Sequence, residues 1–110
     1  MKATSPNWHD VIDERSLEMD RLIAEKIRLD PSMFQVVLNN LRRWTSKPEP
    51  AAATLEWKQF IDSHSQEEVL DFICSWTEES RRMRQSSPFC GILTEQERLA
   101  IFKKYESFRI

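Results

Sequence analysis

Apolar residues along this chain recur every three or four positions, the spacing that gives an α-helix one apolar face. Nowhere do valine and isoleucine alternate with polar residues as they would in a half-buried strand. Ser5 followed by Pro6 predicts the start of a first helix, because a serine cap and a proline at the first helical position favour initiation. Asp30 followed by Pro31 predicts a break before a second helix, whose apolar face runs over 34–44.

Three more helices are predicted after the proline-containing stretch 45–53, which is too short to separate two domains. A short third helix carries the apolar residues of 55–61 and is predicted to end near His64. The capping box Ser65–Glu68 opens a fourth helix that is expected to reach Met83, and a second box, Thr94–Glu97, opens a fifth. The sequence therefore predicts an all-α fold, a compact irregular bundle of about five helices that forms a single domain over residues 1–110.

The charge balance narrows the classes of partner. The chain has 18 acidic and 16 basic residues and a formal net charge of −2. Non-specific binding to nucleic acid depends on a clear basic excess, so nucleic acid is not the favoured partner. Carboxylates are frequent near the start of the first helix, over residues 10–20, where we interpret them as a solvated acidic face favoured by the helix dipole.

The sequence offers no recognisable catalytic or metal-binding pattern. His9, His64, Cys74 and Cys90 are widely separated and match no zinc-ligand spacing. A cysteine nucleophile needs a neighbouring base and an orienting group, which no motif here supplies. The single glycine excludes a glycine-rich phosphate loop. We therefore expect no metal site, no cofactor and no enzymatic activity.

The N-terminal residues pass directly into charged helical sequence without the apolar region of a signal peptide. No run approaches the roughly 20 apolar residues that span a membrane. The chain also has only two cysteines. We therefore expect a cytoplasmic protein with reduced thiols and no membrane association.

The segment from Arg81 to Thr94 is more specific than a helical scaffold requires. Three arginines precede a pair of serines and a proline, and Gly91 offers the conformational freedom of a tight turn. Its apolar residues are predicted either to pack under the bundle or to form part of a binding surface, and its arginines and serines suit an anion or an acidic patch of a partner. The candidate partner-binding residues are Arg81, Arg82, Arg84, Ser86, Ser87 and Phe89.

Residues 84–98 (RQSSPFCGILTEQER), the run from Ala100 to Tyr105 and the opening segment 8–24 resemble a family of short, uncharacterised bacterial all-helical proteins. The likeness spans most of the chain but carries no catalytic motif. It implies a component of a toxin–antitoxin operon, with a nucleotidyltransferase-like toxin as the associated partner. The role implied is to bind and neutralise that toxin.

Our leading hypothesis is a protein-binding module without catalytic activity that acts as an antitoxin, through the 81–93 segment and exposed parts of the first helix. The alternative is a DNA-binding regulator of its own operon, because the second helix ends in Asn39, Asn40, Arg42 and Arg43. One feature argues against DNA binding: the first helix is too long and too acidic to lie against a phosphate backbone. A small inhibitor or adaptor from a mobile element shares the same features, and a homodimer is also left open.

Overall fold

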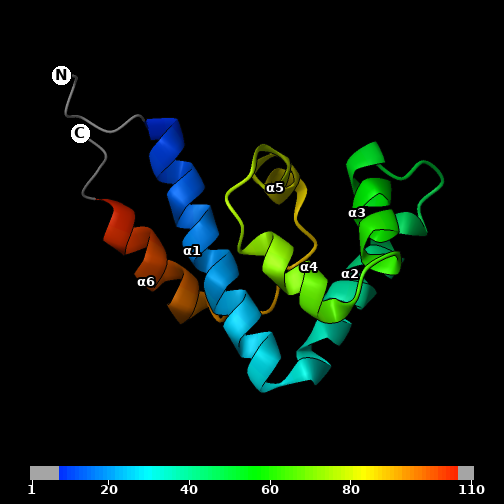
Figure 1. Ribbon diagram of the computed structural model, residues 1–110, viewed down its shortest axis with the longest axis horizontal. Helices are drawn as coiled ribbons and strands as arrows, with labels where there is room; N and C mark the ends of the chain where they lie inside the picture. The colour runs from blue at the N-terminus through cyan, green and yellow to red at the C-terminus, as the bar shows by residue number, and fades with distance from the viewer. Residues whose placement is uncertain (1–7, 107–110) are drawn as a thin grey trace.

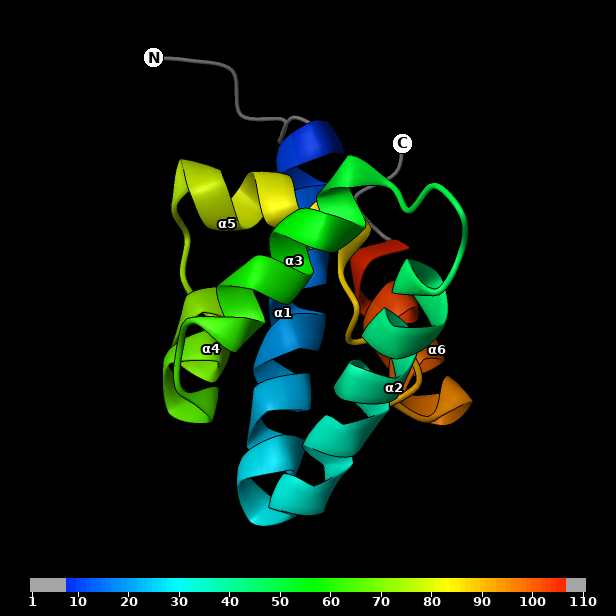
Figure 2. The same ribbon diagram turned by 90° about the vertical axis from the view of Figure 1, so that its right-hand side faces the viewer.

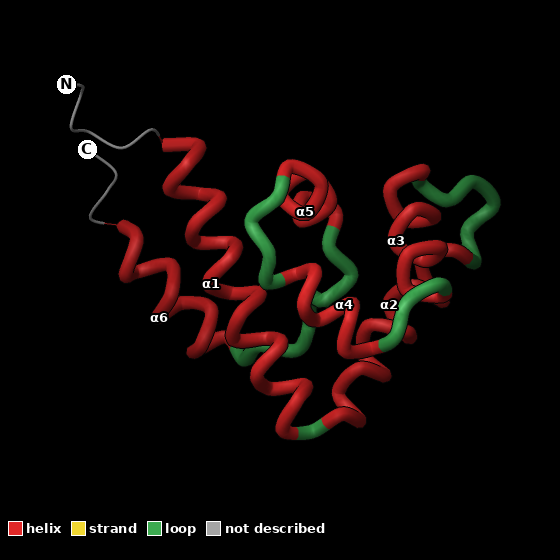
Figure 3. Tube along the Cα trace, in the orientation of Figure 1, coloured by secondary structure: helices red, strands yellow, loops and turns green. Residues whose placement is uncertain are grey.

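The computed structural model describes residues 8–106, with side chains from Asp10 onward. Within that range all regular structure is helical (Figure 3), so the predicted all-α bundle is confirmed. The six α-helices and two single 3₁₀ turns are α1 (Trp8–Leu29), η1 (Pro31–Met33), α2 (Phe34–Thr45), α3 (Ala52–Asp62), α4 (Gln66–Ile73), α5 (Glu78–Met83), η2 (Arg84–Ser86) and α6 (Glu95–Glu106).

Helices α1 and α2 diverge from the η1 turn like the two arms of a V (Figure 1). Helix α4 lies between the arms, α3 lies against α2, and α6 lies alongside α1 on its outer side (Figures 1 and 2). Because Lys104 reaches Glu18 and Glu97 reaches Lys26, helices α1 and α6 run antiparallel. The segment 84–94 crosses from α5 to α6 and thereby touches both arms.

The sequence signals for helix ends are confirmed wherever the structure describes them. The Asp30 side chain accepts a hydrogen bond from the Ser32 amide at the predicted break. Both capping boxes form: Ser65 with Glu68, and Thr94 with Glu97, the latter through reciprocal bonds of 2.8 and 3.1 Å. The predicted helix start at Ser5 and Pro6 lies outside the described residues.

The predicted fourth helix is wrong in one respect, because it is divided into α4 and α5. Helix α4 ends at Ile73, and Thr77 caps a new helix by accepting from the Ser80 amide while the Ser80 hydroxyl accepts from the Thr77 amide. Serine and threonine side chains compete for the backbone in this way and so interrupt a helix. The division lets the chain turn, and it directs α5 and the arginines across α1.

The core lies between α1, α2, α3, α4 and the 88–92 segment. Trp57 is at its centre, 2% exposed, and its indole nitrogen donates to the Met83 carbonyl at 2.9 Å. The Trp57 ring meets Phe60, Phe72 and Phe89 edge-on, with centroid distances of about 6 Å. The other large apolar side chains that are fully buried are Ile27, Val37, Val69 and Leu70.

Candidate functional site

All three arginines in the 81–93 segment pair with carboxylates of the chain itself, and two of these pairs, those of Arg81 and Arg82, are partly exposed. Arg81 donates to Asp13 at 2.8 Å and lies 3.7 Å from Asp10, which joins α5 to the start of α1. Arg82 donates to both carboxylate oxygens of Glu56 on α3, at 2.6 and 3.0 Å. Both arginine side chains remain partly exposed, at 36 and 54%. Their predicted role in partner binding stays a prediction, and it requires a partner that shares or replaces these carboxylates.

The third arginine is buried. The Arg84 side chain is 5% exposed, and its Nε donates to Asp20 on α1 at 3.1 Å. Its Nη2 donates to the carbonyls of Ile73 and Ser75, at 3.0 and 2.8 Å, and so satisfies acceptors at the C-terminal end of α4. Arg84 therefore connects α1, α4 and η2 rather than presenting its charge to a partner. Its Nη1 is buried with no acceptor among the described residues.

The sequence predicted a solvated acidic face that includes Asp20. The structure shows instead that Asp20 is buried, at 6% exposure. Burial raises the pKa of its carboxyl to about 6, and this effect outweighs the lowering by the Arg84 charge. The helical spacing explains the burial, because Asp20 follows Leu17 by three positions and precedes Ala24 by four, and both neighbours are in the core. Asp20 is thus an acidic residue on the apolar stripe of α1, a signal that the carboxylate-rich sequence obscured.

Phe89 belongs to the core, so the structure removes it from the candidate binding surface. It is 1% exposed and packs edge-on against Trp57 and Phe34, because the 88–92 segment folds inward under α2. Asn40 of α2 secures this segment, since its Nδ2 donates to the carbonyls of Pro88 and Cys90, both at 2.9 Å. Of the two predicted arrangements for the apolar residues of the segment, the structure contains the packed one.

The two serines of the segment serve the turn. The Ser87 hydroxyl accepts from the Phe89 amide at 3.1 Å, and Ser86 is half-buried, with its hydroxyl 3.4 Å from the Met83 carbonyl. Gly91 has a φ of +94°, a conformation that side chains other than glycine rarely adopt. The predicted turn at Gly91 is therefore confirmed, and it returns the chain toward α6.

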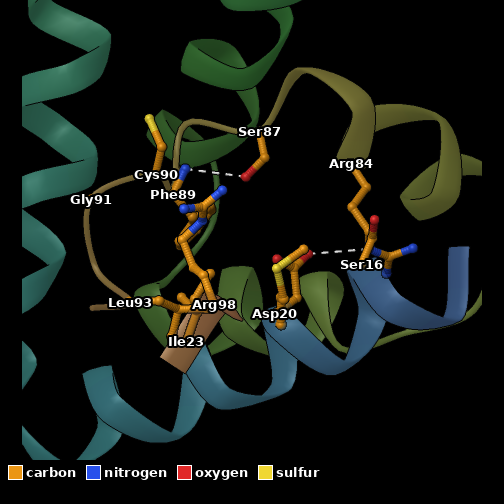
Figure 4. Close-up of a pocket in the computed structure, with 11 residues that line it drawn as sticks. Ser16, Asp20, Ile23, Arg84, Ser87, Phe89, Cys90, Gly91, Leu93 and Arg98 are labelled. Carbon is orange, nitrogen blue, oxygen red and sulfur yellow. Dashed lines mark hydrogen bonds and ion pairs between the residues drawn. The ribbon is translucent and has the colours of Figure 1, made fainter. Parts of the chain in front are cut away.

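Behind this turn lies a pocket of about 210 Å³, which we call the Arg98 pocket. Its walls come from α1, from the 84–93 segment and from the first turns of α6 (Figure 4). Asp20 and Arg84 lie on one side, and Arg98 extends from α6 toward the Ser87 and Phe89 side (Figure 4). The residues that line it are Ser16, Met19, Asp20, Ile23, Arg84, Ser87, Phe89, Cys90, Gly91, Leu93 and Arg98.

A second hollow surface follows the exposed face of α1, between α6 on one side and the α4–α5 connection on the other. Two adjoining depressions of about 610 and 520 Å³ share Glu18 and Arg21, and together we call them the α1 groove. The α1 residues along it recur at helical spacing: Glu14, Leu17, Glu18, Arg21, Leu22, Glu25, Arg28 and Leu29. The other side chains that line it are Cys74, Trp76, Ile101, Lys104 and Tyr105.

The described residues include no group of three histidine, cysteine or carboxylate side chains that could hold a metal ion. Cys74 and Cys90 are free thiols. Burial raises the pKa of the Cys74 thiol, which keeps the thiol protonated. The Cys90 sulfur lies 3.5 Å from Asn40 Nδ2 on α2. His64 packs against the Phe60 ring and lies 2.8 Å from its carbonyl. Among the described side chains, neither thiol is therefore paired with a histidine.

Comparisons with protein-family models, with curated proteins and with solved structures find no match for this chain. Among the described helices none is both long enough and apolar enough to cross a membrane. The site is therefore assessed on its own geometry.

The sequence identified the 81–93 segment but did not identify its neighbours. Arg98 and Asp20, on opposite sides of the pocket, are 78 positions apart, and no local pattern connects them. The α1 groove was foreseen only as exposed parts of the first helix. The Arg98 pocket and the α1 groove both form where two helices meet a turn. The apolar periodicity of a single segment does not predict which helices and turns will meet.

Proposed function

We propose that this protein is a protein-binding module without catalytic activity, and that it neutralises a toxin enzyme by binding it directly. The observation that carries the proposal is the α1 groove. It lies along α1, the longest described helix, and among the described residues it holds two of the four exposed large apolar side chains, Leu29 at 83% and Trp76 at 43% exposure. Exposed apolar groups of this kind, rimmed by charges, mark protein interaction surfaces.

The shape of the groove suits an amphipathic helix of the partner. From Glu14 to Leu29 the groove follows α1 over 15 residue steps, a length of about 22 Å at 1.5 Å per step. Helix α6 and the α4–α5 connection border it, so a partner helix would lie beside α1 as a further member of the bundle, with its apolar face against Leu22, Leu29 and Ile101. Charges of both signs along the rim would fix its register.

Trp76 is the strongest candidate for an anchor residue. The Arg81 guanidinium lies 4.5 Å above its ring, so a tryptophan and an arginine stack at one end of the groove. These two residue types dominate the energetics of protein interfaces. Arg81 was selected from the sequence, and this stacking is what supports keeping it in the proposed interface.

The test is co-expression with the product of the neighbouring gene, followed by size exclusion and titration calorimetry. We expect a complex that Leu29→Glu weakens at least tenfold, because a charge would be buried against the apolar face of the partner. Leu55→Glu is the matched control, since Leu55 is an exposed leucine (47%) on α3, away from the groove. Equal effects of the two variants would refute the groove as the interface, and the absence of any complex would refute the proposal.

The toxin-neutralising role rests on the resemblance of residues 84–98 to the family of short bacterial helical proteins. A growth experiment tests this role separately from binding. Cells that express the neighbouring gene alone should stop growing, and growth should return when this protein is supplied. Leu29→Glu should restore growth less well than Leu55→Glu. If the neighbouring product binds but is harmless to cells, the protein is an adaptor or inhibitor of another kind.

A DNA-binding regulator is a second candidate, which one feature of α2 favours. Gln35, Asn39 and Arg42 are exposed at positions that share one face of the helix, as in a helix that reads a major groove. Asn40, also considered from the sequence, is buried and bound to the 88–92 segment. Fluorescence polarisation with the promoter of the operon distinguishes the candidates, because genuine binding should weaken steeply with salt and with Arg42→Ala.

A further inference from the structure

The Arg98 pocket has a composition that the proposed interface does not explain. Three apolar side chains, Met19, Ile23 and Leu93, line it together with the edge of Phe89. Ile23 and Phe89 also belong to the core, so the pocket adjoins it, whereas Gly91 and Arg98 at the margin of the pocket are exposed. A small apolar group can therefore enter it from solvent and contact these walls without displacing the core.

The charges around the pocket do not cancel. Asp20 and Arg84 are paired with each other, at 3.1 Å. Arg98 forms no ion pair with a carboxylate among the described residues, and its guanidinium lies over the Phe102 ring, 5.4 Å from the ring centroid. The lining residues thus carry one carboxylate and two guanidinium groups, a net charge of +1 that is placed at the margin.

Hydrogen-bond donors add to this charge. The Ser87 hydroxyl accepts from the Phe89 amide and keeps its own proton available. The Ser16 hydroxyl, on α1, makes no hydrogen bond with the described residues. Around the pocket there are therefore a free guanidinium and two hydroxyl protons, while the only anionic group, Asp20, is already engaged with Arg84.

From this geometry we propose that the Arg98 pocket binds a small monocarboxylate with a short, branched or linear apolar body. The carboxylate pairs with the Arg98 guanidinium, which can donate two parallel hydrogen bonds to it, and the body packs against Met19, Ile23 and Leu93. A single negative charge matches the net charge of the lining. A dianion such as a phosphate monoester would leave its second charge without a counter-charge, and an amine would face Arg98.

The size of the pocket restricts the ligand further. A volume of about 210 Å³ accommodates an acid of about six carbon atoms and is too small for a nucleotide. The site and the α1 groove share no lining residue, so ligand binding does not depend on the proposed protein partner. The two proposals can therefore fail separately.

The test is a chemical-shift titration of the full chain with 4-methylpentanoate. We expect saturable shifts confined to residues 16–23 and 87–98. The uncharged analogue 4-methyl-1-pentanol should bind at least tenfold more weakly, and the amine 3-methylbutylamine should cause no saturable shift. Arg98→Ala should weaken binding of the acid at least tenfold, and it leaves the fold intact because the side chain is exposed. Arg42→Ala, an exposed arginine on α2, is the matched control.

Three results would overturn the proposal. The first is an absence of saturable shifts at residues 16–23 and 87–98. The second is an affinity for the alcohol equal to that for the acid, which would show that the pocket recognises only the apolar body. The third is binding of the acid that Arg98→Ala and Arg42→Ala affect equally, since the carboxylate would then not be held by Arg98.

Discussion

The 84–92 segment and helix α6 are neighbours in the chain, yet different forces hold them to the bundle. The segment is anchored by buried groups: Phe89 and Ile92 are 1 and 3% exposed, and Arg84 is paired with Asp20. Helix α6 has one buried apolar side chain, Ile101, while Leu99 is 53% exposed. It is attached mainly by polar contacts at its two ends.

The contacts of α6 show how much of its attachment is polar. The Lys26 ammonium donates to Glu97 at 2.7 Å and to the Ile92 carbonyl at 3.0 Å, and Glu18 accepts from Lys104 and Tyr105. Partly exposed pairs of this kind contribute little to stability and weaken with salt. We infer that the segment forms part of the stable core, whereas α6 can open locally without unfolding it. Four predictions test this contrast, in order of expected effect.

The largest effect is expected from Phe89→Ala. Removing a ring packed against Trp57 and Phe34 leaves a cavity, and we expect a loss of about 4 kcal/mol in the free energy of unfolding. Denaturant unfolding followed by circular dichroism measures it. Leu99→Ala on α6 is the control, with an expected change within about 0.5 kcal/mol. Similar losses for both variants would show that α6 is as much a part of the core as the segment.

Arg84→Met should have the next largest effect, about 3 kcal/mol at neutral pH, because it leaves the Asp20 carboxylate buried without its counter-charge. The double variant Arg84→Met with Asp20→Leu should recover much of the loss, since it removes both charges together. The opposite outcome is a double variant that is less stable than Arg84→Met alone. It would show that the attraction between Arg84 and Asp20 exceeds the free-energy cost of burying their two charges.

Asp20 should also give the protein a measurable pH dependence. Its pKa in the folded protein, about 6, lies above the roughly 3.9 of an unfolded aspartate, so the folded state holds the proton more tightly. The contribution of Asp20 to stability therefore falls as pH rises between these two values, by roughly 1 kcal/mol from pH 5 to pH 7. Unfolding measured across this range should show the slope in the native sequence and lose it in Asp20→Asn.

The Glu97 carboxylate of α6 titrates in the opposite sense. The hydrogen bond from Lys26 lowers the pKa of Glu97, so the stability that Glu97 contributes is present at neutral pH and is lost as pH falls through its lowered pKa. The two regions thus respond to acid in opposite directions. A native protein whose stability rises steadily from pH 5 to pH 7 would contradict the burial of Asp20.

The smallest effect on global stability is expected from Lys26→Met, which removes the ammonium that joins α1 to Glu97 and to the Ile92 carbonyl. The midpoint of unfolding should barely change, but amide protons of α6 should exchange about fivefold faster, because local opening becomes easier. Hydrogen exchange read by mass spectrometry or NMR measures this. Lys58→Met, which breaks an exposed pair within α3, is the control and should leave α6 unchanged.

Local signals in the sequence were sufficient for most of the helices. The Asp30–Pro31 break and the Ser65 and Thr94 capping boxes depend on residues within four positions of one another, so the sequence states them directly. The division at Thr77 is equally local, but Ser80 stands in place of the usual glutamate or glutamine, and the apolar spacing appeared to continue to Met83. At this position the capping residues indicate the helix boundary, and the apolar periodicity does not.

What the sequence by itself determined is the helical class, most helix ends, and the turn at Gly91, because each follows from the conformational preferences of neighbouring residues. Only the tertiary structure decided the roles of the charged residues. Arg81, Arg82 and Arg84 lie within four positions, yet they meet Asp13, Glu56 and Asp20 on two different helices, and one of the three is buried. Whether a charge binds a partner, stabilises the fold or lines a pocket depends on which helix faces meet, and that geometry is set by packing over the whole chain.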